Sequence, residues 1–286
     1  MVRGQTTVAR RQLGRNLRQL RQAAGMTKRE AADRLEWSES KIWRIEGGRT
    51  PLRSMDVQNM CTVYGADEAA AALMGLAQES KTRAWWHSYN APGFNMYASL
   101  EETAWQIDTY EGDLVPGLLQ TPDYVRAIVR SHYPTMADEE VETRVDIRMA
   151  RQRILTRTEG APKVRVALDE TALRRPIGGA AVMAAQIGHL VYVAGVRRAS
   201  IRVVPLSVGA HPGVLSGSFV MMRFPTVVGG EPTTVYGDTL TSGYYLDKDA
   251  EVEQYGAAFA SIWSMALDED ASSRVLAEAA RSYQET

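Results

Sequence analysis

The chain has 286 residues, which is long enough for two domains that each bury a hydrophobic core. Hydrophobic residues make up 45% of the sequence and charged residues 23%, the balance of an ordinary globular protein. The single cysteine, Cys61, excludes an intrachain disulfide and a cysteine-based metal site, and it suits a reducing cytoplasm. No apolar run approaches the roughly 18 residues of a membrane span, and residues 1–12 do not lead into the apolar core of a signal peptide.

Charge is distributed unevenly along the chain. The net charge of −1, taken alone, argues against binding to nucleic acid. Residues 1–55, however, contain 13 Lys and Arg and 5 Asp and Glu, a net charge of +8 that leaves −9 for the remainder. A basic head on an acidic body is the asymmetry expected of a DNA-binding module joined to a domain with another role.

The first two predicted elements are helices. Residues 8–24 are predicted to form one helix, because apolar residues such as Leu13 and Leu17 recur there at helical spacing. Thr27 is the candidate N-cap of the next helix, and Glu30, three residues later, completes a capping box. The second helix therefore has a well-marked start.

A third, short helix is predicted after a tight turn at Glu36 and Trp37. Ser38 is its candidate N-cap. Ile42 and Ile45 are three residues apart, so both point inward on one face of the helix. Two short helices joined by a tight turn form the shape that places a helix in the major groove of DNA.

This stretch resembles the helix-turn-helix domain of the XRE/Cro-repressor family over roughly fifty residues. The residues that carry the resemblance are Leu17, Leu20, Thr27, Ala32, Ser38, Ile42, Ile45, Glu46, Gly47, Gly48, Pro51, Met60 and Val63. Lys28 departs from the pattern, because the family often has Gln there, and Trp43 is bulky for an outward position. The resemblance implies that the second helix of the motif lies in the major groove with its N-terminal residues at base edges.

The resemblance also implies which side chains contact DNA. Glu39, Ser40 and Arg44 are the candidates for base edges, because Arg reads guanine O6 and N7 and a carboxylate accepts from cytosine N4. The complete predicted DNA-binding set is Thr27, Lys28, Ser38, Glu39, Ser40, Lys41, Trp43, Arg44 and Arg49.

Three basic residues of this set are better placed for phosphates, which position a protein without reading sequence. They are Lys28, Lys41 and Arg49, whereas Trp43 could pack on a sugar, a thymine methyl or a neighbouring helix. The simpler interpretation is a small helical bundle with a solvated charged face. The joint spacing and the basic charge favour DNA binding.

Two further helices, residues 53–64 and 67–78, are predicted to complete an all-α bundle of five helices, so a domain boundary is expected between residues 80 and 81. The composition then becomes rich in aromatic residues. These are Trp85, Trp86, Tyr89, Phe94, Tyr97, Trp105 and Tyr110. Such a cluster forms a ligand cage or, more often, a core that joins two domains.

Residues 81–286 are predicted to form an α+β domain with a small, mainly antiparallel sheet. The predicted strands are residues 164–169, 201–206, 218–224 and 233–238. The predicted helices are residues 99–110, a helix that starts at Pro122, and residues 138–158, 180–195, 251–267 and 272–283.

Arg144, Arg148 and Arg151 recur at helical spacing and predict a basic stripe. A stripe of this kind is either a solvated, salt-bridged face or a surface for an acidic partner. The acidic candidates for chemistry are Asp169-Glu170 and Asp238, each at the end of a predicted strand. Helix capping is the simpler role for the first pair, because Thr171 follows it.

The second domain resembles the C-terminal domain of the WhiJ-like actinobacterial regulators over roughly residues 82–275. The stretches that carry the resemblance are WW at 85–86, LE…A…I..YE at 100–111, VPGLLQTPDY at 115–124, R..R..RQ.IL at 144–155, LDE.ALRRPIGG at 168–179 and VVPL…AHPG at 203–213. The resemblance implies transcriptional regulation tied to development or specialised metabolism, in some members with a small acidic partner protein in an antitoxin-like pair. No catalytic residue is implied.

A search for known catalytic motifs finds none, so we expect no enzyme, no cofactor and no metal, and an enzyme joined to a helix-turn-helix is the less favoured alternative. The four His are scattered, and phosphate-binding glycine loops are absent from the sequence. The sequence therefore predicts a cytoplasmic, nucleoid-associated regulator, either a repressor or antitoxin-like, that binds double-stranded DNA as a homodimer. The second domain dimerises and binds a small acidic protein or, alternatively, acts as a sensor for a small-molecule effector.

Overall fold

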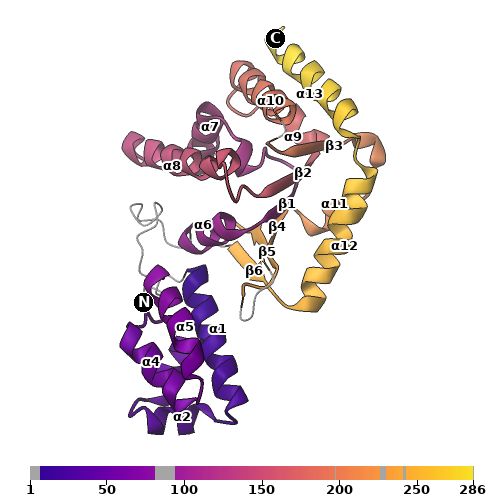
Figure 1. The fold of residues 1–286 in the computed structure, drawn as a ribbon. Helices are drawn as coiled ribbons and strands as arrows, with labels where there is room; N and C mark the ends of the chain where they lie inside the picture. The colour runs from indigo at the N-terminus through magenta and orange to yellow at the C-terminus, as the bar shows by residue number, and fades with distance from the viewer. Residues whose placement is uncertain (1–6, 81–93, 197, 226–229, 241–242, 286) are drawn as a thin grey trace. The chain divides into compact units, whose positions relative to one another are not determined.

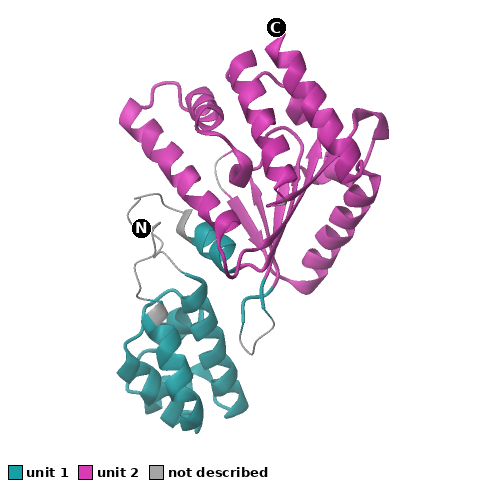
Figure 2. Cartoon of the chain, turned by 45° about the horizontal axis from the view of Figure 1, so that its top comes forward, with its two compact units in different colours: residues 1–103, 224–232 teal, residues 104–223, 233–286 magenta. Residues whose placement is uncertain are grey.

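The computed structural model describes residues 7–80, 94–196, 198–225, 230–240 and 243–285. The chain forms two compact units, as Figure 2 shows. Unit 1 comprises residues 1–103 and 224–232, and unit 2 comprises residues 104–223 and 233–286. Within the described residues, the helices are too short or too polar to cross a lipid bilayer.

Unit 1 contains the predicted helical bundle (Figure 1). Its helices are α1 (Val8–Ala23), α2 (Lys28–Arg34), α3 (Glu39–Glu46), α4 (Ser54–Val63), the 3-10 turn η1 (Asp67–Ala69), α5 (Ala70–Glu79) and α6 (Phe94–Thr103). Their shared core is Leu13, Leu17, Ala31, Ala32, Ile42, Ile45, Leu52, Val57, Met60, Cys61, Tyr64, Ala70, Leu73 and Ala77. The free thiol of Cys61 lies in this core, and burial raises its pKa, so the residue serves as a small apolar core residue.

The boundary between the units differs from the expected position after residue 80. Helix α6 belongs to unit 1 because α1 packs on it. The N–H of Val8 donates to Ser99 Oγ at 2.9 Å, and both groups are buried. The sequence alone does not show this bond, since the two residues are 91 positions apart.

Unit 2 is built on a six-stranded mixed sheet in the order β3-β2-β1-β4-β5-β6. The strands are β1 (Gln106–Glu111), β2 (Lys163–Asp169), β3 (Ser200–Val204), β4 (Phe219–Arg223), β5 (Thr234–Asp238) and β6 (Gly243–Leu246). β1, β2 and β3 are parallel, with Thr109 opposite Val166 and Val166 opposite Ile201. β4, β5 and β6 continue from β1 in antiparallel pairs.

Helices cover both faces of this sheet (Figure 1). The helical segments are η3 (Gly117–Leu119), α7 (Pro122–His132), α8 (Asp138–Arg151), η4 (Gln152–Thr156), α9 (Glu170–Arg174), α10 (Ala180–Gly195), η5 (Leu206–Val208), α11 (Pro212–Ser216), α12 (Asp249–Met265) and α13 (Glu269–Gln284). α12 packs across one face, where Phe259 and Ile262 join a core with Tyr110 and Phe219. α7, α8 and α10 gather on the other face.

The expected sheet was therefore too small, and the observed sheet is mixed: three of its five strand pairs are antiparallel, as expected of most, and the two pairs among β1, β2 and β3 are parallel. Residues 106–111 form the central strand β1, where the sequence predicted the end of a helix. The reason is the buried Asp108, which interrupts the apolar pattern of that strand. Its carboxylate is held between Arg165, at 2.7 Å, and Arg223, and these guanidinium groups lower the pKa of Asp108 although burial opposes them.

Trp85, Trp86 and Tyr89 of the predicted aromatic cluster lie outside the described residues, as does the side chain of Phe94. Among the others, Tyr110 is buried in unit 2 and packs against Phe219 with ring centroids 6.1 Å apart. The Trp105 side chain is 49% exposed. Tyr110 is therefore a core residue of the sheet.

Candidate nucleic-acid interface

Helices α2 and α3 both begin at capping side chains. The Thr27 hydroxyl accepts from the N–H of Glu30 at 3.2 Å, and the Glu30 carboxylate accepts from the N–H of Thr27 at 2.8 Å. This is the predicted capping box, and its hydrogen bonds lower the pKa of Glu30. The Ser38 hydroxyl accepts from the N–H of Lys41 at 3.2 Å. The start of each helix is therefore fixed by its own sequence.

Glu36 forms the turn between the two helices in a left-handed conformation. Its φ of 55° is the only positive value at a non-glycine residue among the residues that the structure describes. The N–H of Trp37 then donates to the carbonyl of Ala32 at 2.8 Å and closes the turn. This geometry ends α2 at Arg34 and lets α3 begin at Glu39, so the turn lies at residues 36–37 as the sequence predicted.

Helix α3 separates a buried face from an exposed one. Ile42 and Ile45 have 0% and 2% of their surface exposed and pack in the core of unit 1. The opposite face is solvent-exposed and carries the residues predicted for base edges and their neighbour, namely Glu39, Ser40, Trp43 and Arg44. The structure thus brings these four predicted residues together on one polar face.

Helix α1 supports the C-terminal end of α3 at very close range. A Cβ on Gly14 would come within 2.6 Å of the Ile45 carbonyl oxygen. The Arg21 guanidinium is buried against the Glu46 carboxylate, with Nε 2.5 Å from Oε1 and Nη2 3.0 Å from Oε2. This pair was missed in the sequence, although Arg21 follows Leu17 by four residues and so lies on the buried face of the helix.

Two of the basic residues predicted for phosphates rest on tryptophan rings. Lys41 Nζ lies 3.2 Å from the ring centroid of Trp37, and the Arg49 guanidinium carbon lies 4.3 Å from that of Trp43. A stacked guanidinium keeps its N–H donors at its edge, where an anion can still bind. Lys28 is partly exposed at the start of α2. The phosphate roles of these three residues remain predictions.

The predicted basic stripe on α8 is not one exposed surface, so that expectation was wrong. Arg144 is exposed and lies over the Tyr133 ring, 4.7 Å from its centroid. Arg148 donates to the Gln120 side-chain carbonyl at 2.7 Å. Arg151 is only 8% exposed and its guanidinium packs against Gly117. The stripe turns inward along the helix because η3 and the segment after it cover its C-terminal half.

The acidic candidates at strand ends have structural partners. Asp169 caps α9 by accepting from the N–H of Thr171 at 2.9 Å, as predicted, and its other oxygen lies 3.3 Å from His211 Nε2. Glu170 pairs with Arg174. Asp238 accepts from the Tyr236 hydroxyl. Helix capping, ion pairing and hydrogen bonding therefore give each of these carboxylates a structural role.

Glu111 is a titratable residue that the sequence reading missed, because it ends the unpredicted strand β1. Burial raises the pKa of its carboxyl to about 7, and the neighbouring Asp238 acts in the same direction. The Ser218 hydroxyl hydrogen-bonds to the carboxylate and opposes this shift. Glu111 is therefore a group in unit 2 that changes charge near neutral pH.

The capped pair α2 and α3, with a buried isoleucine face and an exposed polar face, defines unit 1 as a helix-turn-helix domain. Comparison with known families agrees: residues 12–74 match the helix-turn-helix domain family. Residues 94–278 match the family described as a domain of unknown function (DUF5753), and the chain belongs to that family. The predicted combination of an XRE-like helix-turn-helix with a characteristic C-terminal domain is confirmed. No curated protein and no solved structure matches the chain.

Proposed function

We propose that this protein is a sequence-specific, DNA-binding transcriptional regulator, with α3 as its recognition helix in the major groove. The observation that carries the proposal is the exposed face of α3, where Glu39, Ser40 and Arg44 point away from the isoleucine core. Arg44 suits guanine, and Glu39 suits cytosine. The net charge of +8 on residues 1–55 supplies the attraction to the phosphate backbone.

The regulator acts as a two-fold homodimer, because a single helix of this length reads too few base pairs to define a site. A symmetric dimer of helix-turn-helix domains binds half-sites about 34 Å apart, or a multiple of that distance. The operator is therefore a near-palindrome. Unit 2 supplies the dimer contact and binds a further partner, a small acidic protein, which makes the chain repressor-like or antitoxin-like. Arg144 is the residue of the α8 stripe with an exposed guanidinium for such a partner.

The alternative for unit 2 is a sensor that binds a small-molecule effector. The candidate place for such an effector is an open surface depression lined by His132, Tyr133, Pro134, Thr135, Met136, Ala137 and Glu140. A compound that raises the Tm of the wild type and leaves that of Tyr133→Ala unchanged would favour the sensor over the protein-binding role.

Selection of bound sites from a pool of random duplexes tests the main proposal. The full-length chain is expected to enrich an inverted repeat, and its affinity for that repeat should fall steeply with salt because phosphate contacts release counterions. Enrichment of no motif, in the presence or absence of a co-purified partner, would mean that the helical bundle is a protein-binding module.

A further inference from the structure

A short segment of unit 1 is continuous with two strands of unit 2. β4 ends at Arg223 and β5 begins at Thr234, and residues 224–232 between them belong to unit 1 (Figure 2). β4 and β5 are antiparallel neighbours, with Met221 opposite Val235. Only Pro232 and Thr233 separate Glu231 from the first residue of β5, so a change in the pairing of β4 with β5 reaches Glu231 through the chain itself.

Glu231, near the end of this segment, is held by helix α1. Its side chain is 1% exposed. Glu231 Oε1 lies 2.9 Å from Arg11 Nη2, and Oε2 lies 2.7 Å from Arg15 Nη2. The two arginines are four residues apart, so they face the same side of α1. A buried carboxylate between two guanidinium groups is strongly tied to its place, because removing one arginine leaves one of its oxygens without that partner and moving it away from both leaves a buried charge uncompensated.

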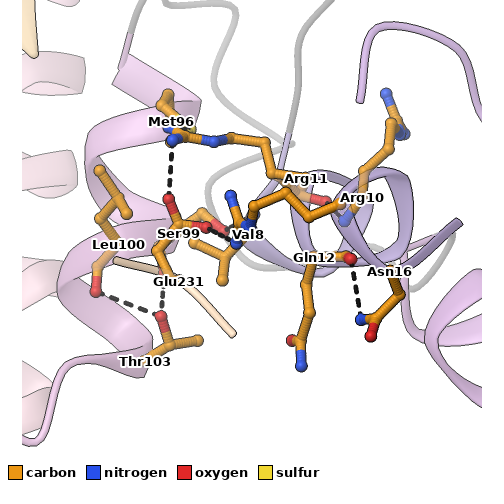
Figure 3. Close-up of polar contacts among 12 residues, drawn as sticks. Val8, Arg10, Arg11, Gln12, Asn16, Met96, Ser99, Leu100, Thr103 and Glu231 are labelled. Atoms are coloured by element: carbon orange, nitrogen blue, oxygen red, sulfur yellow. Dashed lines mark hydrogen bonds and ion pairs between the residues drawn. The ribbon is translucent and has the colours of Figure 1, made fainter. Parts of the chain in front are cut away.

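The start of α1 is also fixed to α6 (Figure 3). The Val8–Ser99 hydrogen bond joins the first residue of α1 to the middle of α6. Arg10 Nη2 adds a bond to the carbonyl of Ser80 at 3.4 Å. Glu231 therefore contacts α1 within two turns of an end that is held by hydrogen bonds.

The same two turns of α1 carry the end of the recognition helix. A Cβ on Gly48, the second residue after α3, would come within 2.9 Å of Arg11 Cα. Gly14, directly before Arg15, touches the carbonyls of Ile45 and Glu46. Arg11 thus contacts the residues after α3 with its backbone and Glu231 with its guanidinium.

We propose that Glu231 is a coupling residue, through which strands β4 and β5 and the recognition helix α3 each respond to the state of the other. The path runs from β5, which pairs with β4, through Pro232 and Thr233 to Glu231, and then through Arg11 and Arg15 of α1 to the end of α3. The coupling rests on the proposed DNA binding for its biological effect. Coupling between two binding sites is reciprocal. The factor by which DNA at α3 changes the affinity for a partner at β4 and β5 therefore equals the factor by which that partner changes the affinity for DNA.

Hydrogen exchange of the full-length chain tests the coupling without DNA. In Arg15→Gln, exchange of the β4 and β5 amides should rise at least about 5-fold, the lower end of typical coupling, although the substitution lies in α1. Glu231→Gln should raise exchange in α1 by a similar factor, and the double variant should add little, since both remove one interaction. Arg18→Gln, an exposed arginine of the same helix, is the matched control and should leave the strands unchanged.

The second arm adds the selected duplex. In the wild type, the duplex should slow exchange in α3 and also in β4 and β5, and Glu231→Gln should abolish the effect on the strands. Glu278→Gln, an exposed carboxylate on α13, controls for the change in net charge. Two results would overturn the coupling. One is an Arg15→Gln variant in which amide exchange changes in α1 alone. The other is a duplex that slows exchange in α3 and leaves exchange in β4 and β5 unchanged. A duplex that does not bind would count against the proposed function, and the arm without DNA would still decide the coupling.

Discussion

Glu36, in the turn between α2 and α3, has a left-handed backbone conformation that is unfavourable for residues other than glycine. A residue other than glycine at φ 55° costs roughly 1–2 kcal/mol, and the Glu36 side chain is exposed. Glu36→Gly should therefore raise the free energy of unfolding by up to about 1 kcal/mol, after the greater chain entropy of glycine is subtracted. Urea unfolding measures this change. Glu36→Ala keeps the strain, so a stability of the alanine variant equal to that of the glycine variant would contradict the account.

Lys28 is expected to contact a phosphate, and this role has its own signature. Lys28→Ala should weaken binding to all duplexes alike and reduce the slope of log affinity against log salt by about one. Fluorescence anisotropy at several salt concentrations measures both effects. A loss of affinity confined to one operator sequence, with an unchanged salt slope, would show that Lys28 reads a base.

Glu111 makes the stability of unit 2 depend on pH. Its carboxyl ionises near pH 4.5 in the unfolded chain and at about 7 in the folded one. Between these values the unfolded state loses its proton first, so stability is full below about pH 4.5 and falls as pH rises towards 7. Glu111→Gln should raise the Tm at pH 8 and change it little at pH 4. The exposed Glu278→Gln should show no such difference, and an equal effect of Glu111→Gln at both pH values would exclude this titration.

At the scale of elements, the crossing of α1 and α3 depends on Gly14. An added methyl group would meet two backbone carbonyls of α3, which cannot rotate away. Gly14→Ala should therefore lower the free energy of unfolding by about 1–3 kcal/mol, the usual effect of overpacking. Gly75→Ala, at an exposed position of α5, meets no atom within 4 Å and should raise stability by about 0.5–1 kcal/mol. Thermal unfolding of the two variants compares them, and changes of the same sign would contradict the close crossing.

The helices of unit 1 could be predicted because local signals mark them. Thr27, Glu30 and Ser38 cap helices through residues three positions away, and the isoleucines repeat at helical spacing. Strand β1 could not be predicted, because Asp108 is stable in its centre only through Arg165 and Arg223, 57 and 115 positions away. Its parallel pairing with β2 likewise depends on distant residues and leaves no local pattern.

The candidate site likewise has features that the local sequence predicts and features that depend on distant residues. The exposed face of α3 follows from periodicity, so Glu39, Ser40 and Arg44 were placed correctly from the sequence. The stacking of Lys41 on Trp37 depends on the turn between two helices, which periodicity does not describe. Glu231 lies 216 positions from Arg15, and a single acidic residue in a connection between strands gives no signal of that contact.

At the scale of the whole molecule, residues 1–55 have a net positive charge and the remaining residues have a net negative charge. The helix-turn-helix match falls largely in the first part and the DUF5753 match in the second. In the proposed function, the basic first part is attracted to the phosphate backbone and the acidic remainder is repelled by it, which favours approach of the helix-turn-helix to the duplex. This arrangement suits a regulator whose second unit stays available to a partner. The central claim is that α3 reads the sequence of the duplex.

The most direct measurement repeats the selection of bound duplexes with Arg44→Ala beside the wild type. The account predicts that the wild type enriches an inverted repeat and that the variant loses preference at one base pair in each half-site. That loss corresponds to about 1–3 kcal/mol of discrimination at that position, with the other positions retained. A variant that enriches the same repeat with the same preference at every position would contradict a base-reading role for α3.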